Sequence, residues 1–280
     1  MKFSLIMATL GRKEEIDIFL NSLLLQTYNC FELIIIDQNT DDKVYEICKN
    51  YKERINIKHI RSDVRGLSLN RNIGLINCTG DIVAFPDDDC EYDPSTLKNV
   101  LDFFLENGHY SFYTCNTKEK YSDKTILSVK KNSTEISIYN FMQTGISFTI
   151  FIRIEKIVNF KFDEQMGVGA EYGSAEESDL LLYLLKNHNR GYYHSDVFIF
   201  HPYKEDTAEK SLSYGKGYGA LFKKAVIVYK FNSLFFIFIY TIIKQSIKLI
   251  VNPFDKIRRT SIKARLYGFI YYKAAIKRQN

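Results

Sequence analysis

The chain lacks the features that define several common classes of protein. Its five cysteines, in 280 residues, form no CxxC pair, and several lie in apolar segments. This spacing argues against a zinc site and a disulfide framework, and it indicates a reducing compartment. No small-residue cleavage site follows residues 1–10, so we interpret them as a first strand and not as a signal peptide. The 46% apolar content suits one full globular domain with an appendage.

Charge is distributed unevenly along the chain. From Lys216 to the end there are 14 Lys and Arg against one acid, Asp255, which is a net charge of +13. The whole chain carries +5, so residues 1–215 carry −8, the difference between the two. We therefore expect the chemistry in the acidic part, and an anionic partner, nucleic acid or a lipid surface, at the basic tail.

Three consecutive carboxylates follow an apolar run of strand length. Residues 82–85 lead through a proline to Asp87, Asp88 and Asp89. Adjacent like charges raise one another's pKa, and a protein that keeps them together usually binds a cation there. Oxygen ligands suit Mg²⁺ or Mn²⁺, which also bind substrate phosphates. A solvated acidic turn is the alternative interpretation, and the flanking sequence decides between the two.

Apolar strands alternate with helices in the first part of the chain. Strands are predicted over Lys2–Ala8, Phe31–Ile36 and Ile55–Ile60, with helices between them. Strands that are apolar throughout indicate an α/β fold with a mostly parallel sheet, covered by helices on both faces. Ligands of such sheets bind beyond the carboxyl ends of the strands. Thr9, Asp37 and the three aspartates each follow a strand, so they are predicted to converge on one cleft.

Further elements are predicted with their alternatives open. A helix is expected over residues 42–53, and strands over Gly145–Arg153 and Gly191–Phe200. Arg71 is a surface helix residue or a partner for phosphate or carboxylate at the cleft, a role for which arginine is well suited. The polar segment Asn116–Thr144 is weakly patterned, and we expect it to help set substrate choice.

A second acidic cluster opens a predicted helix near residue 176. Ser174 and Glu177 match a capping box, and acids in a first turn favour the helix dipole, so a structural interpretation accounts for Glu176, Glu177 and Asp179. Glu177 nevertheless shares a helix face with Leu181 and leans toward the core. Partial desolvation there raises its pKa, which suits a general base.

Taken together, these motifs resemble the family 2 glycosyltransferases of the GT-A fold, over about residues 1–220. The resemblance implies a Rossmann-like, mostly parallel sheet with helices on both faces. It implies a catalytic domain over 1–220, with a nucleotide-sugar half at 1–115 and an acceptor half at 116–220, before a helical tail at 221–280. The matching features, in the family's order, are the strand before Thr9, Ile34–Asp37, Asn70–Gly74, Gly80–Asp89 and Gly173–Leu182.

The resemblance implies inverting, metal-assisted transfer of a hexosyl or N-acetylhexosaminyl group. The donor is a nucleotide-diphosphate sugar, most often UDP-linked. The acceptor is a hydroxyl of a glycan or a lipid-linked oligosaccharide, as in capsule or lipopolysaccharide assembly. The residues implied for nucleotide binding are Thr9, Arg12, Asp37, Asn39, Arg71, Asp87 and Asp88.

The same resemblance implies the metal ligands and the base. Mn²⁺ or Mg²⁺ is expected on Asp89, Asp88 and His201, although a histidine before a proline is more often a packing residue. Glu177 is the expected base. Glu176 and Asp179 stay alternatives, because much of the family has Glu-Asp where this chain has Glu-Glu.

The tail combines apolar and basic residues. The apolar run Phe231–Ile243 has thirteen residues, fewer than the ~20 that cross a bilayer, so it is predicted as an in-plane or docking helix. After Pro253, cations including Lys277 and Arg278 mix with apolar residues in a pattern suited to anionic headgroups. This predicts a peripheral location on the cytoplasmic face of the cell membrane. A helical hairpin packed on the catalytic domain or in a dimer is the alternative.

Two rival functions fit parts of the sequence. A sugar nucleotidyltransferase also uses metal-binding acids, but it opens with a longer glycine- and arginine-rich phosphate loop than residues 9–12 provide. A non-catalytic nucleic-acid-binding protein fits the basic tail. It leaves the acidic cleft unexplained, since acids without a metal repel phosphate, and we therefore expect no nucleic-acid partner.

Overall fold

The computed structural model describes residues 1–120, 130–203, 205 and 207–274. The chain packs into two units. Lys277, Arg278 and part of the predicted 116–144 segment lie outside the described residues. The predicted domain boundary at residue 220 stays a prediction. In the structure, residues 162–183 pack in the same unit as the tail helices. Unit 1 comprises Met1–Arg65, Leu69–Lys161 and Leu184–Lys204, and unit 2 comprises Gly66–Ser68, Phe162–Tyr183 and Glu205–Asn280.

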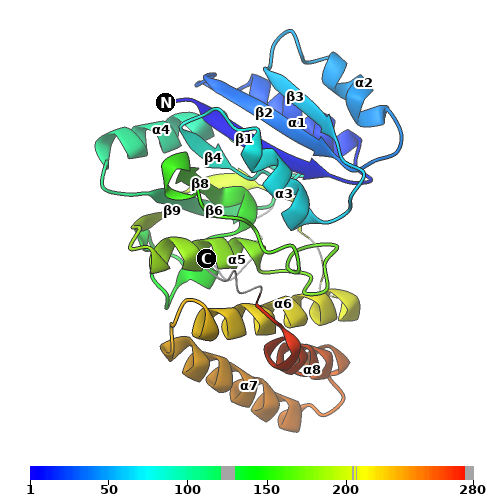
Figure 1. The fold of residues 1–280 in the computed structure, drawn as a ribbon, viewed down its shortest axis with the longest axis vertical. Coiled ribbons are helices and arrows are strands. Elements are labelled where there is room, and N and C mark those ends of the chain that lie inside the picture. The colour runs from blue at the N-terminus through cyan, green and yellow to red at the C-terminus, as the bar shows by residue number, and fades with distance from the viewer. Residues whose placement is uncertain (121–129, 204, 206, 275–280) are drawn as a thin grey trace, which may run out of the picture. The chain divides into compact units, whose positions relative to one another are not determined.

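Among the described residues of unit 1, nine strands form one sheet in the order β3-β2-β1-β4-β8-β6-β9-β5, with β7 paired to β9 (Figure 1). The four strands β3, β2, β1 and β4 are parallel, and β8 joins them antiparallel. The mostly parallel α/β fold is thereby confirmed. The strands are β1 Phe3–Thr9, β2 Phe31–Asp37, β3 Ile57–Arg61, β4 Ile82–Ala84, β5 Glu91–Tyr92, β6 Phe112–Lys118, β7 Thr134–Glu135, β8 Ile150–Arg153 and β9 Gly191–Phe200.

Helices cover both faces of this sheet, as predicted. Phe3, Leu5 and Met7 of β1 point to one face and join the core cluster that the apolar side of α1 completes. Ile6 points to the other face, where α3 lies so close that a Cβ on Gly74 would be 2.2 Å from its side chain. The helices of this region are α1 Glu14–Leu24, α2 Lys43–Lys49, α3 Leu67–Ile76 and α4 Thr96–Glu106.

Two predicted elements of unit 1 are shorter in the structure. The helix expected over 42–53 ends at Lys49, because separate turns follow it and bring Tyr51 and Ile55 into the core. The strand expected over 145–153 is β8 only in its second half. Its first half is a 3₁₀ turn, closed by a hydrogen bond from the Ile146 amide to Thr149 Oγ1 of 3.2 Å.

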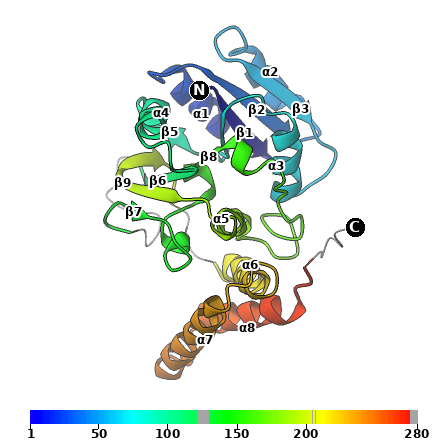
Figure 2. The ribbon, with the colours of Figure 1, turned by 60° about the vertical axis from the view of Figure 1, so that its left-hand side comes forward.

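Unit 2 contains the start of α5 (Glu176–Lys186) and three tail helices, α6 Ala208–Ile227, α7 Ser233–Val251 and α8 Lys256–Tyr271 (Figure 2). Helices α6 and α8 approach closely through small residues. A Cβ on Gly219 would lie 2.0 Å from the Arg265 carbonyl oxygen, and one on Gly268 equally close to that of Lys216. Gly219 of α6 and Gly268 of α8 therefore serve the packing of these two helices.

The predicted apolar helix of the tail is longer than its sequence pattern indicated. Helix α7 has 19 residues, because it continues beyond Ile243 through Lys244 and Lys248. By length and composition alone it is long and apolar enough to cross a membrane. The length of the apolar run, thirteen residues, is therefore no argument against a span, and the orientation of α7 has to be argued from its packing.

One buried carboxylate makes the stability of unit 1 depend on pH. Glu32 on β2 accepts hydrogen bonds from Ser4 Oγ (2.6 Å), the Thr79 amide (2.8 Å) and Lys2 Nζ (2.7 Å). Although burial opposes ionisation, these donors lower the pKa of Glu32 to about 2. Its stabilising contribution is present above the pKa of the unfolded chain, about 4.3, and is lost as the pH falls toward 2.

We predict that Glu32→Gln lowers the free energy of unfolding by about 2 kcal/mol at pH 7, less than the full linkage value because water screens part of the site. The difference from wild type should shrink steadily below about pH 4.3. Urea unfolding at a series of pH values measures it. Glu106→Gln, at an exposed position of α4, is the control, and an equal loss at every pH contradicts the prediction.

Candidate functional site

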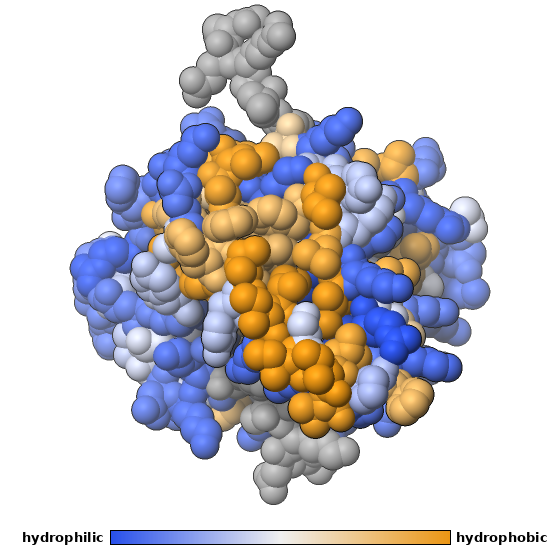
Figure 3. Space-filling model, turned by 90° about the horizontal axis from the view of Figure 1, so that it is seen from below, coloured by the Kyte–Doolittle hydropathy of each residue, from blue (hydrophilic) through white to orange (hydrophobic). Residues whose placement is uncertain are grey.

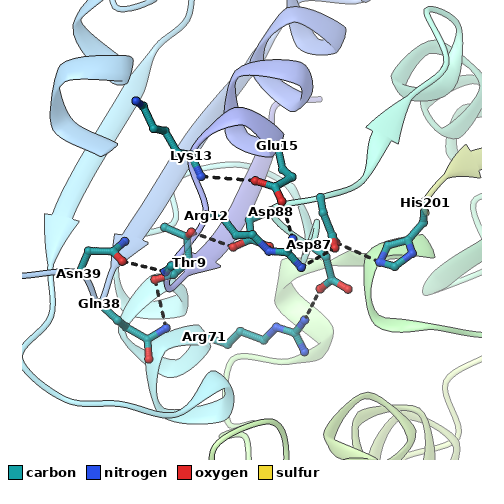
Figure 4. A network of polar contacts seen from close by, with 12 residues as sticks. Thr9, Arg12, Lys13, Glu15, Gln38, Asn39, Arg71, Asp87, Asp88 and His201 are labelled. Carbon is teal, nitrogen blue, oxygen red and sulfur yellow. Dashed lines mark hydrogen bonds and ion pairs between the residues drawn. The ribbon is translucent and has the colours of Figure 1, made fainter. Parts of the chain in front are cut away.

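Side chains from the carboxyl ends of β1, β2 and β4 meet at one edge of the sheet in unit 1 (Figure 4). Thr9 lies opposite Asp37 in the parallel register of β1 and β2. The Thr9 hydroxyl donates to Asp88 Oδ2 at 2.7 Å. The structure therefore brings together Thr9, Asp37 and Asp88, which were predicted to meet because each follows a strand. Their part in nucleotide binding stays a prediction.

Two arginines accompany the three consecutive aspartates. Arg71 on α3, only 1% exposed, lies 3.1 Å from Asp87. Arg12 lies 2.9 Å from Asp89 and 3.7 Å from Asp88. Arg71 is therefore a buried partner of the acidic cluster, and the alternative of a surface helix residue is wrong.

The crowding of carboxylates changes the protonation of the middle one. The pKa of Asp88 is raised to about 6, chiefly by burial and also by the charges of Asp89 and Asp87, against the lowering effects of the Thr9 hydrogen bond and Arg12. This is the direction that three adjacent acids predict. A divalent cation at the cluster acts in the opposite sense and favours the ionised form.

His201 reaches this cluster through a strand pairing that sequence reasoning missed. The two-residue strand β5, directly after the aspartates, pairs antiparallel with the end of β9, so Glu91 lies opposite Phe200. His201 is the next residue, and its Nε2 lies 3.0 Å from Asp89 Oδ1. Its ring stacks on Phe148 at a centroid distance of 4.8 Å. Packing thus orients the imidazole toward the carboxylate.

Among the described residues, one group could hold a metal ion. Asp87, Asp89 and His201 each offer a ligand atom, and these atoms lie within 4.8 Å of one another. Two carboxylates and an imidazole suit Mn²⁺, and the set also leaves positions for phosphate oxygens. The expected ligands Asp89 and His201 belong to this group. Asp88 does not, and its carboxylate bonds to Thr9 instead.

Asp37 anchors a second set of polar residues. It is fully buried and accepts hydrogen bonds from the Asn39 amide (2.9 Å) and side chain (2.8 Å). His59 Nε2 lies 2.9 Å and Arg61 Nη1 lies 3.7 Å from its other oxygen. Neither His59 nor Arg61 was predicted. The parallel register of β2 and β3, which puts Arg61 opposite Asp37, was the signal that could have revealed Arg61.

The second acidic cluster lies at the start of α5 in unit 2. Asp179, 1% exposed, forms an ion pair with Lys224 (2.8 Å) and accepts a hydrogen bond from the Tyr229 hydroxyl (2.8 Å). Lys224 also pairs with Asp163 at 3.0 Å. Two strong partners and full burial favour a structural role for Asp179 over that of a base.

The two glutamates of α5 differ in accessibility. Glu176 is 5% exposed, and its carboxylate packs against Gly167, where a Cβ would lie 3.2 Å away and where φ is +95°. Glu177 is half-buried. Of the two, Glu177 offers its carboxylate more readily to a reactant.

The model of the family described as "Glycosyl transferase family 2" matches residues 4–167, more than half of the chain. The chain belongs to glycosyl transferase family 2. This membership confirms the resemblance drawn from the motifs. It also favours a glycosyltransferase over a sugar nucleotidyltransferase or a nucleic-acid-binding protein.

Curated relatives match parts of the chain. One is the poly(ribitol-phosphate) beta-N-acetylglucosaminyltransferase TarS of Staphylococcus aureus, 31% identical over 38% of this chain and 19% of its own length. Another is the GalNAc(5)-diNAcBac-PP-undecaprenol beta-1,3-glucosyltransferase of Campylobacter jejuni, 26% identical over 74% of this chain and 66% of its own. The matches span a fifth or less of the length of several relatives.

Solved structures share the fold. S. aureus TarS 1–349 in complex with UDP-GlcNAc aligns with a TM-score of 0.66 at 22% identity, over 81% of this chain and 66% of that one. A mannosyltransferase of Pyrobaculum calidifontis, in complex with GDP-Man and Mn²⁺, aligns with a TM-score of 0.66 at 13% identity, over 96% and 87%. The family 2 chain thus has a GT-A fold, which suggests dependence on a divalent metal.

We predict that Asp89→Asn and His201→Gln each weaken Mn²⁺ binding at least about tenfold. Loss of a residue that only supports a metal ligand already costs about that much, and loss of a ligand should cost no less. Calorimetric titration of Mn²⁺ without nucleotide measures it. Asp102→Asn, on the exposed part of α4, should bind as wild type does. Unchanged affinity in both site variants contradicts the assignment of Asp87, Asp89 and His201 as the metal site.

We predict that Arg71 and Asp87 are energetically coupled. Arg71→Met should lower the free energy of unfolding by about 2 kcal/mol, below the usual cost of breaking a buried pair because Asp87 is 29% exposed. In the Asp87→Asn background the loss should be smaller by about 1 kcal/mol. Urea unfolding of the four proteins measures this coupling.

A matched control for this cycle is the exposed pair Lys98 and Asp102, whose side chains are 49% and 41% exposed. Its coupling should not exceed about 0.5 kcal/mol. If the two pairs have equal coupling energies, the prediction that burial strengthens the Arg71–Asp87 pair is wrong.

Proposed function

We propose that the protein is an inverting glycosyltransferase. It transfers a hexosyl or N-acetylhexosaminyl group from a UDP-sugar to a hydroxyl of a glycan or lipid-linked oligosaccharide. The observation that carries the proposal is the group Asp87, Asp89 and His201, at the strand ends of a family 2 fold and beside Thr9 and Arg12. The similarity to TarS, crystallised with UDP-GlcNAc, supports the choice of nucleotide.

The roles follow from chemistry and position. Asp87, Asp89 and His201 would hold Mn²⁺ or Mg²⁺, which would supply positive charge to neutralise the departing diphosphate. Thr9, Asp37 and Asn39 hold the nucleoside, and Arg71 and Arg12 add positive charge beside the diphosphate. Asp88, positioned by Thr9, faces the ribose. The half-buried Glu177 takes the proton of the acceptor hydroxyl while the oxygen of that hydroxyl attacks the anomeric carbon.

We propose a peripheral location on the cytoplasmic face of the cell membrane. The basic tail and a lipid-linked acceptor support this location, and the Campylobacter relative is named for an undecaprenol-linked substrate. Enzymes of capsule or lipopolysaccharide assembly meet such acceptors at the membrane surface.

The donor site is tested by calorimetric titration of UDP with and without Mn²⁺. Wild type should bind UDP more tightly with the metal, because a cation held by the carboxylates would offset the negative charge of the diphosphate. Asp89→Asn should lose that dependence. Asp102→Asn is again the control. If UDP does not bind under either condition, GDP- and dTDP-sugars are titrated next, and failure of all three rejects the donor site.

The base is tested by Glu177→Gln, which keeps the side-chain length and the hydrogen-bonding capacity. Turnover of the donor–acceptor pair should fall about 100-fold or more, while UDP affinity stays as in wild type. Glu176→Gln should mainly lower the thermal midpoint, since that carboxylate is packed. Retention of most turnover in Glu177→Gln shows that another group is the base.

A further inference from the structure

Helix α7 presents an extended apolar surface to solvent. Figure 3 shows it as a continuous hydrophobic band bordered by hydrophilic residues. Only 11% of its most apolar 18-residue window is buried within the described residues. The side chains of this surface, here called the α7 apolar face, are Phe235, Phe236, Ile239, Tyr240, Ile243, Ile247, Ile250 and Val251.

These side chains occupy one side of the helix. At ~100° per residue they fall within an arc of about 160°. Lys244 and Lys248 lie just beyond one edge of that arc, where long side chains can reach headgroups. The buried residues Leu234 and Phe238 lie on the opposite side. One side of the helix is therefore packed through apolar residues within the protein, while the apolar side opposite to it faces solvent.

The covered side packs on α8, which runs alongside α7. Phe238 stacks on Phe269 at 4.5 Å near one end, and Arg258 Nε donates to Gln245 Oε1 at 3.2 Å further along. Helix α8 carries five cations, Lys256, Arg258, Arg259, Lys263 and Arg265. If α7 spanned a bilayer, these charges would be carried to the depth of the hydrocarbon, where each is costly.

The charge around the α7 apolar face identifies its partner. From Asn232 to Tyr271 the single acid is Asp255, and it caps α8 and pairs with Arg258 at 2.8 Å. An apolar strip flanked by cations alone matches the boundary between acyl chains and anionic headgroups. A protein partner would need an apolar groove with a long acidic rim. The apolar strip and its flanking cations fit an anionic bilayer without any such special shape.

We propose that the α7 apolar face lies in the plane of an anionic bilayer, with α7 parallel to the surface and embedded by half its width. Lys244, Lys248 and the exposed cations of α8 contact the headgroups. The proposal rests on the proposed function only in taking the protein to be membrane-associated. The element that binds, its orientation and the charge of the lipid are inferred from the structure of α7 and α8. Unit 2 is in this way a monotopic anchor.

The absence of tryptophan from the sequence makes the test direct. Phe236, Ile243 and Ile250 are seven residues apart on the centre of the face, so Phe236→Trp, Ile243→Trp and Ile250→Trp each give one fluorophore. Leu105→Trp, 62% exposed on α4, is the control. The full chain is mixed with phosphatidylcholine vesicles, with and without phosphatidylglycerol, and with lipids brominated at shallow or deep positions.

In-plane insertion predicts a blue shift and equal shallow quenching at all three α7 positions, and none at Leu105→Trp. A span predicts the deepest quenching at Ile243→Trp and overturns the proposal. Binding should be at least about tenfold stronger with phosphatidylglycerol and should weaken with salt. No vesicle binding, or binding indifferent to anionic lipid, also overturns it.

A second pair of variants separates the face from general effects of charge. Ile243→Asp should reduce vesicle binding at least about tenfold, whereas Leu105→Asp, an equivalent change at an exposed apolar residue, should not. Mn²⁺ and UDP titrations of Ile243→Asp without vesicles should match wild type. Loss of vesicle binding with an intact donor site separates this proposal from the proposed function, which fails independently if UDP does not bind.

Discussion

The repulsion among Asp87, Asp88 and Asp89 is the constraint on which the rest of unit 1 depends. Three carboxylates at the end of one strand are stable together only where cations and hydrogen-bond donors surround them. The fold supplies Arg71 from α3, Arg12 from the turn after β1, and the Thr9 hydroxyl. These groups come from three separate elements, so the acidic cluster exists only when the sheet edge is assembled.

The same arrangement makes the cluster suited to a metal. Each outer carboxylate already faces one arginine, and His201 adds a nitrogen ligand next to Asp89. A divalent ion bound there would meet a site whose charge is partly balanced beforehand, and in the proposed function the arginines would lie beside it to meet a diphosphate. The raised pKa of Asp88 reflects its burial first and the charges of Asp89 and Asp87 second.

Unit 2 is held together by different physics. A buried lysine, Lys224, joins Asp163 and Asp179, and small residues allow α6 and α8 to touch backbone to backbone. Breaking such a buried ion pair is costly, so these contacts fix the helices firmly. A rigid pair of helices can leave one side of α7 apolar and uncovered, and that exposed side is the basis of the in-plane membrane anchor proposed here.

The sequence by itself determined the α/β alternation, the parallel strands and the family. Continuous apolar strands and polar residues just after them are local patterns, and the carboxyl ends of parallel strands always share an edge. For that reason Thr9, Asp37 and the aspartates were placed together correctly. The approximate position of the acidic helix α5 and the strand before His201 were readable in the same way.

Only the tertiary structure decided which further side chains join these residues and which of them are buried. The two-residue strand β5 is too short to leave a periodic signal, yet its pairing with β9 brings His201 to Asp89. Burial of Arg71 and Asp179, and the pairing of Asp37 with His59 and Arg61, depend on contacts between distant segments. The end of α7 also escaped the sequence pattern, because two lysines interrupt the apolar run without ending the helix. Local periodicity reports the elements, whereas the partners of a charged side chain are set by packing between them.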